Sequence, residues 1–210
     1  ICRILGQRAP EHFTYELFLD ESGQKISKTS GNGVSIDEWL SYANTESLSY
    51  FMYQKPKTAK RMHFDVIPKA MDEYQQQLRA YADQDSKAKL NNPVFHIHGH
   101  NVPTSDMVVP FTMLLNLAAV ANAAEKGQLW GFIQRYAPEA SAETHPGLDQ
   151  AVGFAVRYYN DFVKPAKVFR AATDLEREAL ADLRDQLVAY TGDLDAEALQ
   201  TVVFACGRER

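Results

Sequence analysis

A succession of helical signals of uneven length after residue 34 limits the fold more than any other feature of this chain. Ser35 with Glu38, and Thr173 with Glu176, have the spacing of a capping box, which begins a helix. Apolar residues at helical spacing predict helices over 36–43, 46–54, 65–82, 106–125, 128–136, 148–163, 174–190 and 196–206. Because these helices differ in length and no internal repeat is present, an irregular helical bundle is favoured over a solenoid.

Two further local patterns complete the predicted fold. The larger apolar residues of 12–20 alternate with other residues, a polar turn follows at 20–23, and 24–27 would return as the second strand of a hairpin. In the predicted helix 65–82, Asp65 is the expected N-cap, and one apolar stripe is expected to be buried: Ile67, Ala70, Met71, Tyr74, Leu78 and Tyr81. The predicted fold class is mainly α, a short β-hairpin followed by the helical bundle.

The stretch from Gly23 to Gly33, GQKISKTSGNG, is typical of a loop that holds phosphate. Lys25 and Lys28 supply positive charge, the hydroxyls of Ser27, Thr29 and Ser30 supply hydrogen-bond donors, and the two late glycines free the backbone. It is not a Walker A loop, because there the glycines precede the Lys-Thr pair. The alternative is a solvated basic turn with no ligand.

The flanks of this loop resemble one family. KISKT is similar to the KMSKS signature of class I aminoacyl-tRNA synthetases, with Ile26 in place of methionine and Thr29 in place of the final serine. Residues 15–74, and the stretch NNPVFHIHGHNVP at 91–103, resemble the class I lysyl-tRNA synthetases. The resemblance extends from Ile1 to beyond Val163. Ile26 keeps an apolar anchor under the loop and Thr29 keeps a hydroxyl, so we expect neither change to remove function.

The resemblance implies a division of the chain and a reaction. Residues 1–45 would be the tail of a class I catalytic domain with its KMSKS-type loop, and 46–210 a helical anticodon-binding region, an α-helix cage. No HIGH-type motif lies in 1–20, so we expect a C-terminal fragment of a longer enzyme, itself inactive. That enzyme would form lysyl-adenylate from ATP and lysine and transfer lysine to tRNA(Lys).

The resemblance also assigns roles to residues of the loop. Lys25 and Lys28 are the expected catalytic cations, and Lys25, Ser27, Lys28 and Thr29 the expected ATP-binding residues. Mg²⁺ would arrive with ATP, because no residue here is a dedicated metal ligand. Two other interpretations stay open at this point: a non-catalytic tRNA-binding module, and a helical interaction domain without an RNA partner.

Charge is unevenly distributed along the chain. The net charge of −5 argues against wholesale coating of nucleic acid, and we expect no DNA partner. Between residues 53 and 70, however, the only acidic residue is Asp65, which predicts a tRNA-phosphate contact formed by Lys55, Lys57, Lys60 and Arg61. The alternative is a solvated helix surface. Two distant cysteines favour a reducing cytoplasm, and the most apolar stretch, 107–123, is too short to span a membrane.

Two aromatic and histidine clusters have competing interpretations. His96, His98 and His100 would lie on one face of a strand and could bind a metal. Because prolines and Gly99 interrupt the segment, we prefer hydrogen-bonded histidines in an irregular connector between helices. The aromatic side chains of Tyr50, Phe51 and Tyr53 are predicted to be core residues, with stacking on nucleotide bases as the alternative.

Overall fold

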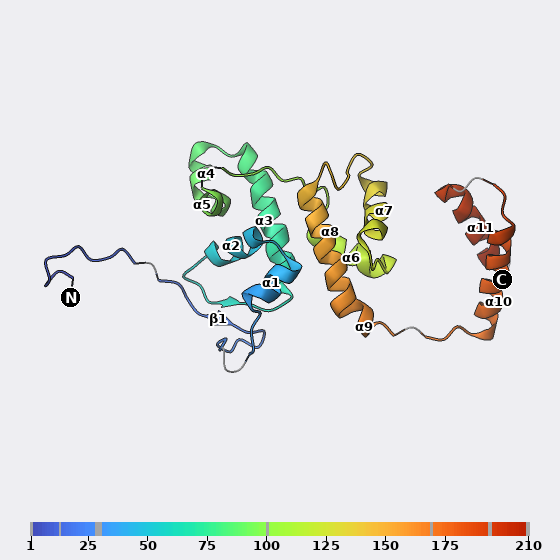
Figure 1. Cartoon of the computed structure of the whole chain (residues 1–210), viewed down its shortest axis with the longest axis horizontal. Helices are drawn as coiled ribbons and strands as arrows, with labels where there is room; N and C mark the ends of the chain where they lie inside the picture. Colours follow the sequence, from blue (N-terminus) through green and yellow to red (C-terminus); the bar gives the residue numbers. More distant parts are fainter. Residues whose placement is uncertain are drawn as a thin grey trace. The chain divides into compact units, whose positions relative to one another are not determined.

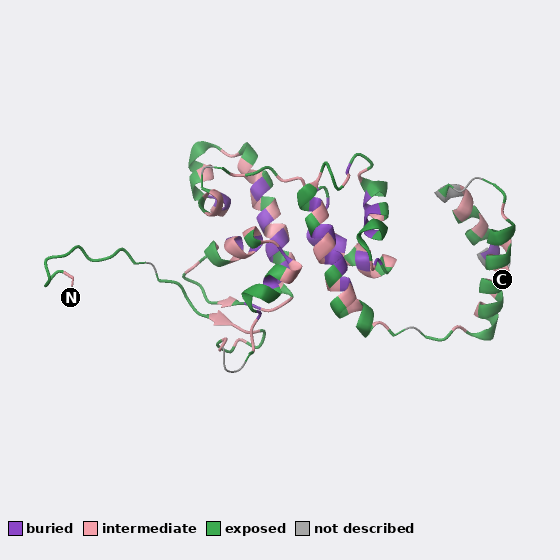
Figure 2. Cartoon of the chain, in the orientation of Figure 1, coloured by how far each residue is buried: buried purple, intermediate pink, exposed green. Residues whose placement is uncertain are grey.

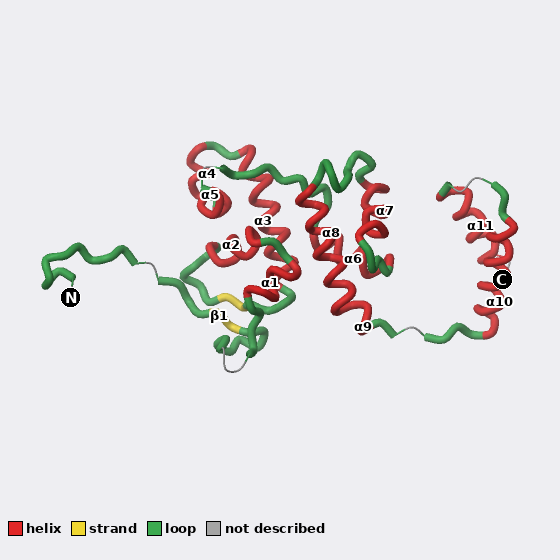
Figure 3. Tube along the Cα trace, viewed as in Figure 1, coloured by secondary structure: helices red, strands yellow, loops and turns green. Residues whose placement is uncertain are grey.

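The computed structural model of the chain is shown in Figure 1. The structure describes residues 2–12, 14–27, 31–99, 101–168, 170–192 and 195–208. The chain forms two compact units, Ile1–Ala166 and Lys167–Arg210. Helices dominate both units, so the predicted mainly α fold class is confirmed (Figure 3). The boundary predicted at residue 45 stays a prediction. None of the helices among the described residues is long and apolar enough to cross a membrane.

The first unit contains a small sheet and most of the helices. Its elements are β1 (Phe18–Leu19), α1 (Ile36–Tyr42), α2 (Thr45–Tyr53), β2 (Lys60–Arg61), α3 (Val66–Asp83), α4 (Ser86–Asn91), α5 (Pro93–His98), α6 (Phe111–Ala121), α7 (Lys126–Tyr136), α8 (Pro146–Tyr158), the π-helical segment η1 (Tyr159–Val163) and α9 (Lys164–Ala166). The second unit contains α10 (Asp174–Ala189) and α11 (Ala196–Arg208).

The β structure is smaller than predicted and has an additional partner. The hairpin is present, because Leu19 forms an antiparallel bridge with Lys25 and the Ile26 N–H donates to the Phe18 carbonyl at 3.0 Å. The strand predicted over 12–20 is wrong in length, since only Phe18 and Leu19 belong to it. β1 also pairs in parallel with β2, Phe18 opposite Lys60. A parallel pair of this kind joins distant segments, so local alternation could not predict it.

Capping explains where several helices begin. Both predicted capping boxes are confirmed, Ser35 with Glu38 before α1 and Thr173 with Glu176 before α10. Asp65 is the residue before α3, but its side chain makes no capping hydrogen bond. α6 begins at Phe111 and ends at Ala121, inside the predicted range 106–125. Its first N–H groups donate to the Asp72 carboxylate of α3, from Phe111 at 2.5 Å and from Thr112 at 3.1 Å.

The connector predicted around the histidines is wrong, because the segment forms the short helices α4 and α5. Asp85 begins α4 by accepting a hydrogen bond from the Ala88 N–H at 2.7 Å. Asn92 begins α5 in the same way, accepting from the Val94 N–H at 3.1 Å. Pro93 occupies the first turn of α5, where a missing N–H does no harm. The proline therefore starts a helix here.

The core of the first unit is built from buried residues of α1, α3, α6, α7 and α8, and buried segments are purple in Figure 2. Of the predicted stripe on α3, Tyr81 is only partly buried and the other five residues are buried. Trp39 of α1 is fully buried, and its indole N–H donates to the Ser47 hydroxyl at 3.1 Å. A second, smaller cluster comprises Tyr50, Tyr74, Leu78 and Val94. The core thus fixes α1, which directly follows the loop.

Candidate functional site

The side chain of Asn32 connects several parts of the base of the loop. Its amide oxygen accepts from the Ser27 N–H at 3.1 Å, and its amide nitrogen donates to the Asp20 carboxylate at 2.6 Å and to the Lys25 carbonyl at 3.3 Å. Asn32 therefore bridges the outgoing arm, the turn of the hairpin and the returning arm. A side-chain amide that satisfies three partners in this way fixes the distance between the two ends of a loop.

Asp20 is the second polar residue of this base. Its carboxylate accepts hydrogen bonds from the Ser22 hydroxyl at 2.7 Å and from the Gln24 N–H at 2.8 Å, in addition to Asn32. The Ser22 hydroxyl, the Gln24 N–H and the Asn32 amide together lower the pKa of Asp20 from its ordinary value of 3.8. The carboxylate is consequently ionised near neutral pH and remains the acceptor that closes the turn.

Ile26 and Gly33 bring the two arms into van der Waals contact. Ile26 packs against the main core cluster, so the expected apolar anchor under the loop is confirmed. A Cβ atom on Gly33 would lie 2.7 Å from Cδ1 and from Cγ2 of Ile26, closer than real Cβ contacts. Only glycine fits at this position without moving the isoleucine. The sequence shows the glycine, but the contact that requires it depends on the folded hairpin.

The outer part of the loop begins at Ser27 and returns at Gly31. The Gly31 N–H donates to the Ser27 carbonyl at 3.1 Å, and Gly31 has a φ of +59°, in the left-handed region that favours glycine. Lys25 is exposed and Ser27 is partly buried. Lys28, Thr29 and Ser30 lie outside the described residues, so their predicted roles stay predictions. The described part of the site thus comprises the segments before and after these residues.

The returning arm leads directly into the core. Val34 is buried, Ser35 caps α1, and Trp39 fixes α1 in the core. Beside this arm lies a groove of about 760 Å³, lined by Asp20, Glu21, Ser22, Gly31, Asn32, Gly33, Val34, Glu38, Met62, His63, Phe64 and Asp65. The capping hydrogen bonds from Ser35 lower the pKa of Glu38. The loop is therefore attached on one side to a hairpin and on the other to a helix that Trp39 anchors in the core.

The predicted tRNA-contact residues divide into two kinds. Lys55, Lys57 and Arg61 are exposed. The Lys60 ammonium instead donates to the backbone carbonyls of Phe51 and, at 3.2 Å, Met52, and lies 5.2 Å from the centre of the Phe51 ring. Burial lowers the pKa of Lys60. Its contacts stabilise the C-terminal end of α2, where the helix dipole favours a cation.

His96 and His98 are hydrogen-bonded, as predicted. His96 contacts the Leu90 carbonyl through Nε2 at 2.8 Å, and Nε2 of His98 lies 2.9 Å from the Tyr74 hydroxyl. The described residues contain no group of three His, Cys, Asp or Glu side chains that could hold a metal ion. His100 lies outside the described residues. Among the aromatic residues, Tyr50 is buried and Phe51 partly buried, whereas Tyr53 is 45% exposed, so the core prediction is wrong for Tyr53.

Sequence reasoning missed Asn32 and Asp20 as the residues that shape the loop. Asn32 stands in the Gly-Asn-Gly stretch that reads as a simple turn, and its three hydrogen-bond partners come from positions that only the hairpin brings together. A usable signal was present: asparagine between two glycines is typical of side-chain bonds to the nearby backbone. Aspartate at the start of a turn is another such signal.

Comparison with known proteins relates this chain to tRNA synthetases. Residues 1–101 match the family described as tRNA synthetases class I (K). Over 210 residues the chain is 77% identical to the lysine–tRNA ligase of Roseobacter denitrificans, covering 100% of this chain and 40% of that protein. Over 209 residues, 99% of the chain, it is 46% identical to the lysine–tRNA ligases of Rickettsia felis and Rickettsia rickettsii, again covering 40% of each. The chain therefore spans about two fifths of these relatives.

Proposed function

We propose that this chain is the C-terminal part of a class I lysine–tRNA ligase and supplies its ATP-phosphate loop and part of its tRNA-docking surface. The observation that carries the proposal is the 77% identity to a lysine–tRNA ligase along the whole chain. The hydrogen-bonded base formed by Asp20 and Asn32 supports it, because a phosphate-binding loop needs its two ends fixed. The named relatives are ligases, which favours part of an enzyme over a non-catalytic module.

In the first half-reaction, the carboxylate of lysine attacks the α-phosphorus of ATP. A bond forms between the carboxylate oxygen and phosphorus, and the bond from phosphorus to the pyrophosphate oxygen breaks. Negative charge builds on the leaving pyrophosphate, and positioned cations stabilise a transition state most where charge develops. We assign this role to Lys28, assisted by Lys25, with Ser27 and Thr29 orienting the loop. Closure of the loop around ATP would bring these groups to the phosphates.

In the second half-reaction, a hydroxyl of the terminal ribose of tRNA attacks the lysyl carbonyl, and AMP leaves. This chain would hold the RNA through Lys55, Lys57 and Arg61, whose exposed charges suit phosphate contacts. Lys60 has the same charge, but its ammonium is already bonded to the end of α2, so we assign it a supporting role in this surface. Mg²⁺ would enter with ATP, because the substrate phosphates supply much of its usual coordination.

The test is lysine-dependent exchange of pyrophosphate into ATP, followed by transfer of lysine to tRNA. The full-length protein should perform both reactions with lysine and neither with other amino acids. The isolated 210-residue chain should perform neither and should still bind tRNA. Exchange that depends on a different amino acid would contradict the assignment to lysine. Exchange by the isolated chain would contradict the division of labour proposed for it.

A further inference from the structure

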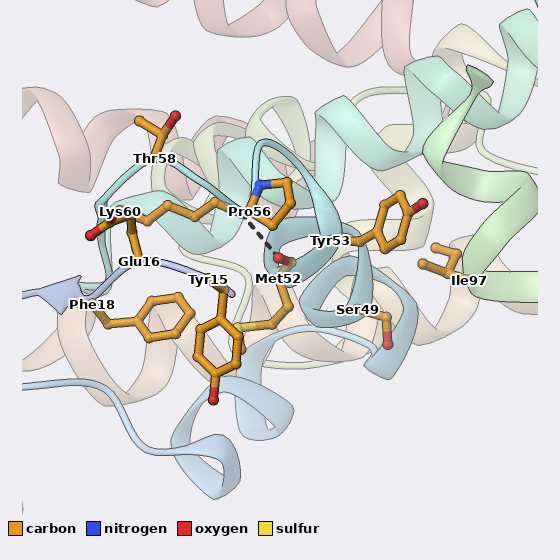
Figure 4. Close-up of a pocket in the computed structure, with 10 residues that line it drawn as sticks. All are labelled: Tyr15, Glu16, Phe18, Ser49, Met52, Tyr53, Pro56, Thr58, Lys60 and Ile97. Atoms are coloured by element: carbon orange, nitrogen blue, oxygen red, sulfur yellow. Dashed lines mark hydrogen bonds between the residues drawn. The ribbon is translucent and has the colours of Figure 1, made fainter. Parts of the chain in front are cut away.

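A second cavity lies on the side of β1 and α2, apart from the groove beside the loop. Its volume is about 420 Å³, and its lining residues are Tyr15, Glu16, Phe18, Ser49, Met52, Tyr53, Pro56, Thr58, Lys60 and Ile97 (Figure 4). The size lies within the range of small-ligand sites, which are mostly apolar with a few polar groups. Nothing in the proposed chemistry of the loop uses this pocket.

Aromatic rings form a preorganised surface on one side of the pocket. The Tyr53 ring is stacked on His96, with 5.2 Å between ring centres and 21° between planes. The His96 ring is itself held by the Leu90 carbonyl and by an edge contact with Phe95. His96 covers one face of Tyr53, and the tyrosine is still 45% exposed. A ring fixed in this way can stack on a further planar group without losing much conformational freedom.

Two exposed lysines stand next to a residue that lines the pocket. Lys55 and Lys57 flank Pro56, which lines it, and both lysines are exposed. Lys55 also has a φ of +45°, in the left-handed region that a residue with a side chain rarely adopts. Such backbone strain is concentrated at ligand clamps and active sites. The Thr58 N–H donates to the Lys55 carbonyl at 3.1 Å, and the Glu16 N–H donates to the Pro56 carbonyl at 3.0 Å, so the turn is held against the pocket.

A pocket lined by aromatic rings, with two exposed lysines on either side of a lining residue, is suited to a nucleotide. A base stacks on the ring, and the phosphates on either side of it meet the lysines. An apolar protein segment would use the rings equally well but would gain nothing from the two lysines. On the basis of the proposed function, we propose that this pocket binds one unpaired base of the tRNA, stacked at Tyr53, with the adjacent phosphates at Lys55 and Lys57.

The wall of the pocket also indicates which bases fit better. Glu16 is the only acidic residue among the lining residues, and its carboxylate can accept a hydrogen bond from an exocyclic amino group. Cytosine and adenine carry such a group, whereas uracil does not. Cytosine or adenine is therefore favoured over uracil. The pocket and the phosphate loop share β1, since Phe18 lines the pocket and its carbonyl accepts the Ile26 N–H.

The experiment measures binding of single-stranded RNAs of about 12 nucleotides, within the usual range of single-strand site sizes, to the full-length protein by fluorescence anisotropy. Oligo(C) and oligo(U) are compared with a chain of equal length built of abasic spacers, so that the affinity ratio isolates the contribution of the bases. We expect Tyr53→Ala to lower the oligo(C)-to-abasic ratio about 10-fold, the order of effect when one stacking ring is removed. Tyr53→Phe keeps the ring and should change the ratio less than about 2-fold.

Three further variants separate the contribution of the lysines from that of Glu16 and provide a control. Lys55→Ala with Lys57→Ala should weaken all three probes equally and leave the ratio unchanged. Glu16→Gln should reduce the preference for oligo(C) over oligo(U). Tyr136→Ala is the matched control, an exposed tyrosine of α7 that lies outside the pocket, and it should change nothing.

An unchanged oligo(C)-to-abasic ratio in Tyr53→Ala would overturn the inference. If the unfolding temperature of that variant is also lowered, another part of the protein covers the pocket. An unchanged ratio with lysine-dependent exchange intact defeats the base pocket alone, whereas absence of exchange in the parent protein defeats the proposed function.

Discussion

The loop segment 20–34 and the helical core of the same unit are stabilised in different ways. Of the described residues in this segment, only Val34 is buried, and the arms are joined mainly by the side chains of Asp20 and Asn32. In α6, by contrast, Phe111, Leu114 and Ala118 are almost completely buried. A hydrogen bond near the surface contributes little net free energy to folding, because water can replace either partner. Buried apolar side chains contribute more, because unfolding exposes them to water. If the proposed function holds, we therefore expect catalysis and stability to depend on separate residues.

The largest expected effect is on the reaction. In the full-length protein, Lys28→Ala should lower the rate of lysine-dependent pyrophosphate exchange about 10²–10³-fold, the usual loss when one charge-stabilising group is removed from a transition state. The unfolding free energy should change by less than about 0.5 kcal/mol if Lys28 serves the reaction and not the fold. Lys87→Ala, an exposed lysine of α4, is the control. If Lys28→Ala raised only the Michaelis constant for lysine, the role assigned to Lys28 would be wrong.

The core should show the opposite behaviour. Leu114→Ala removes a side chain that is 0% exposed, so it should lower the free energy of unfolding by about 3 kcal/mol. Val120→Ala on the same helix, at 83% exposure, should change it by less than about 0.5 kcal/mol. Guanidinium unfolding followed by tryptophan fluorescence measures both variants. A large loss of exchange activity per folded molecule in Leu114→Ala would break the separation between core and loop.

The contact between Ile26 and Gly33 lies where the loop meets the core. Gly33→Ala should destabilise the protein by about 1–3 kcal/mol, because the new methyl group overlaps Ile26. In an Ile26→Ala background the same change should have a much smaller effect, because all three overlapping atoms belong to the isoleucine side chain beyond Cβ. The double-mutant cycle measures this coupling directly. Equal effects in the two backgrounds would show that the clash is absent.

The basic residues at 55–61 allow a finer comparison, between exposed cations expected to contact tRNA and one cation bonded to the end of α2. Replacing Lys55, Lys57 and Arg61 by alanine should flatten the slope of log affinity for tRNA against log salt by about 0.7–0.9 for each phosphate that is no longer neutralised. Lys60→Ala should leave the slope nearly unchanged and lower stability by about 1 kcal/mol, because it removes hydrogen bonds to the end of α2. Anisotropy titrations over several salt concentrations, with cognate and non-cognate tRNA, measure the slope. Selective weakening of cognate binding would mean that these residues contact bases.

What the sequence predicted was determined mainly by neighbours in the chain. The capping boxes at Ser35 and Thr173, and the buried stripe of α3, follow from residues three or four positions apart. The structure confirms both boxes and the stripe except at Tyr81, which is only partly buried. The pairing of β1 with β2 and the stacking of Tyr53 on His96 join residues far apart in sequence. No local pattern contains such contacts. The helix α5 was missed for a different reason, since its proline was taken as a breaker although the first turn tolerates it.

The composition of the sequence predicted the loop, but it did not predict the hydrogen bonds that hold the base of the loop. Lysines, hydroxyls and glycines in one short stretch indicated phosphate binding. The role of Asn32 became visible only when Asp20, Lys25 and Ser27 were placed around it. For Lys60, the charge alone predicted a contact with RNA. The structure shows that its ammonium donates a hydrogen bond to a carbonyl at the end of α2.

The central claim is that hydrogen bonds at the base of the loop serve the reaction and contribute little to folding. Asn32→Ala in the full-length protein tests it most directly, with pyrophosphate exchange and guanidinium unfolding measured on the same samples. We expect exchange to fall at least about 10-fold, because misplaced catalytic groups lose much of their effect. Stability should fall by no more than about 1 kcal/mol. Exchange at the parent rate, or a loss of activity fully explained by unfolding, would contradict the account.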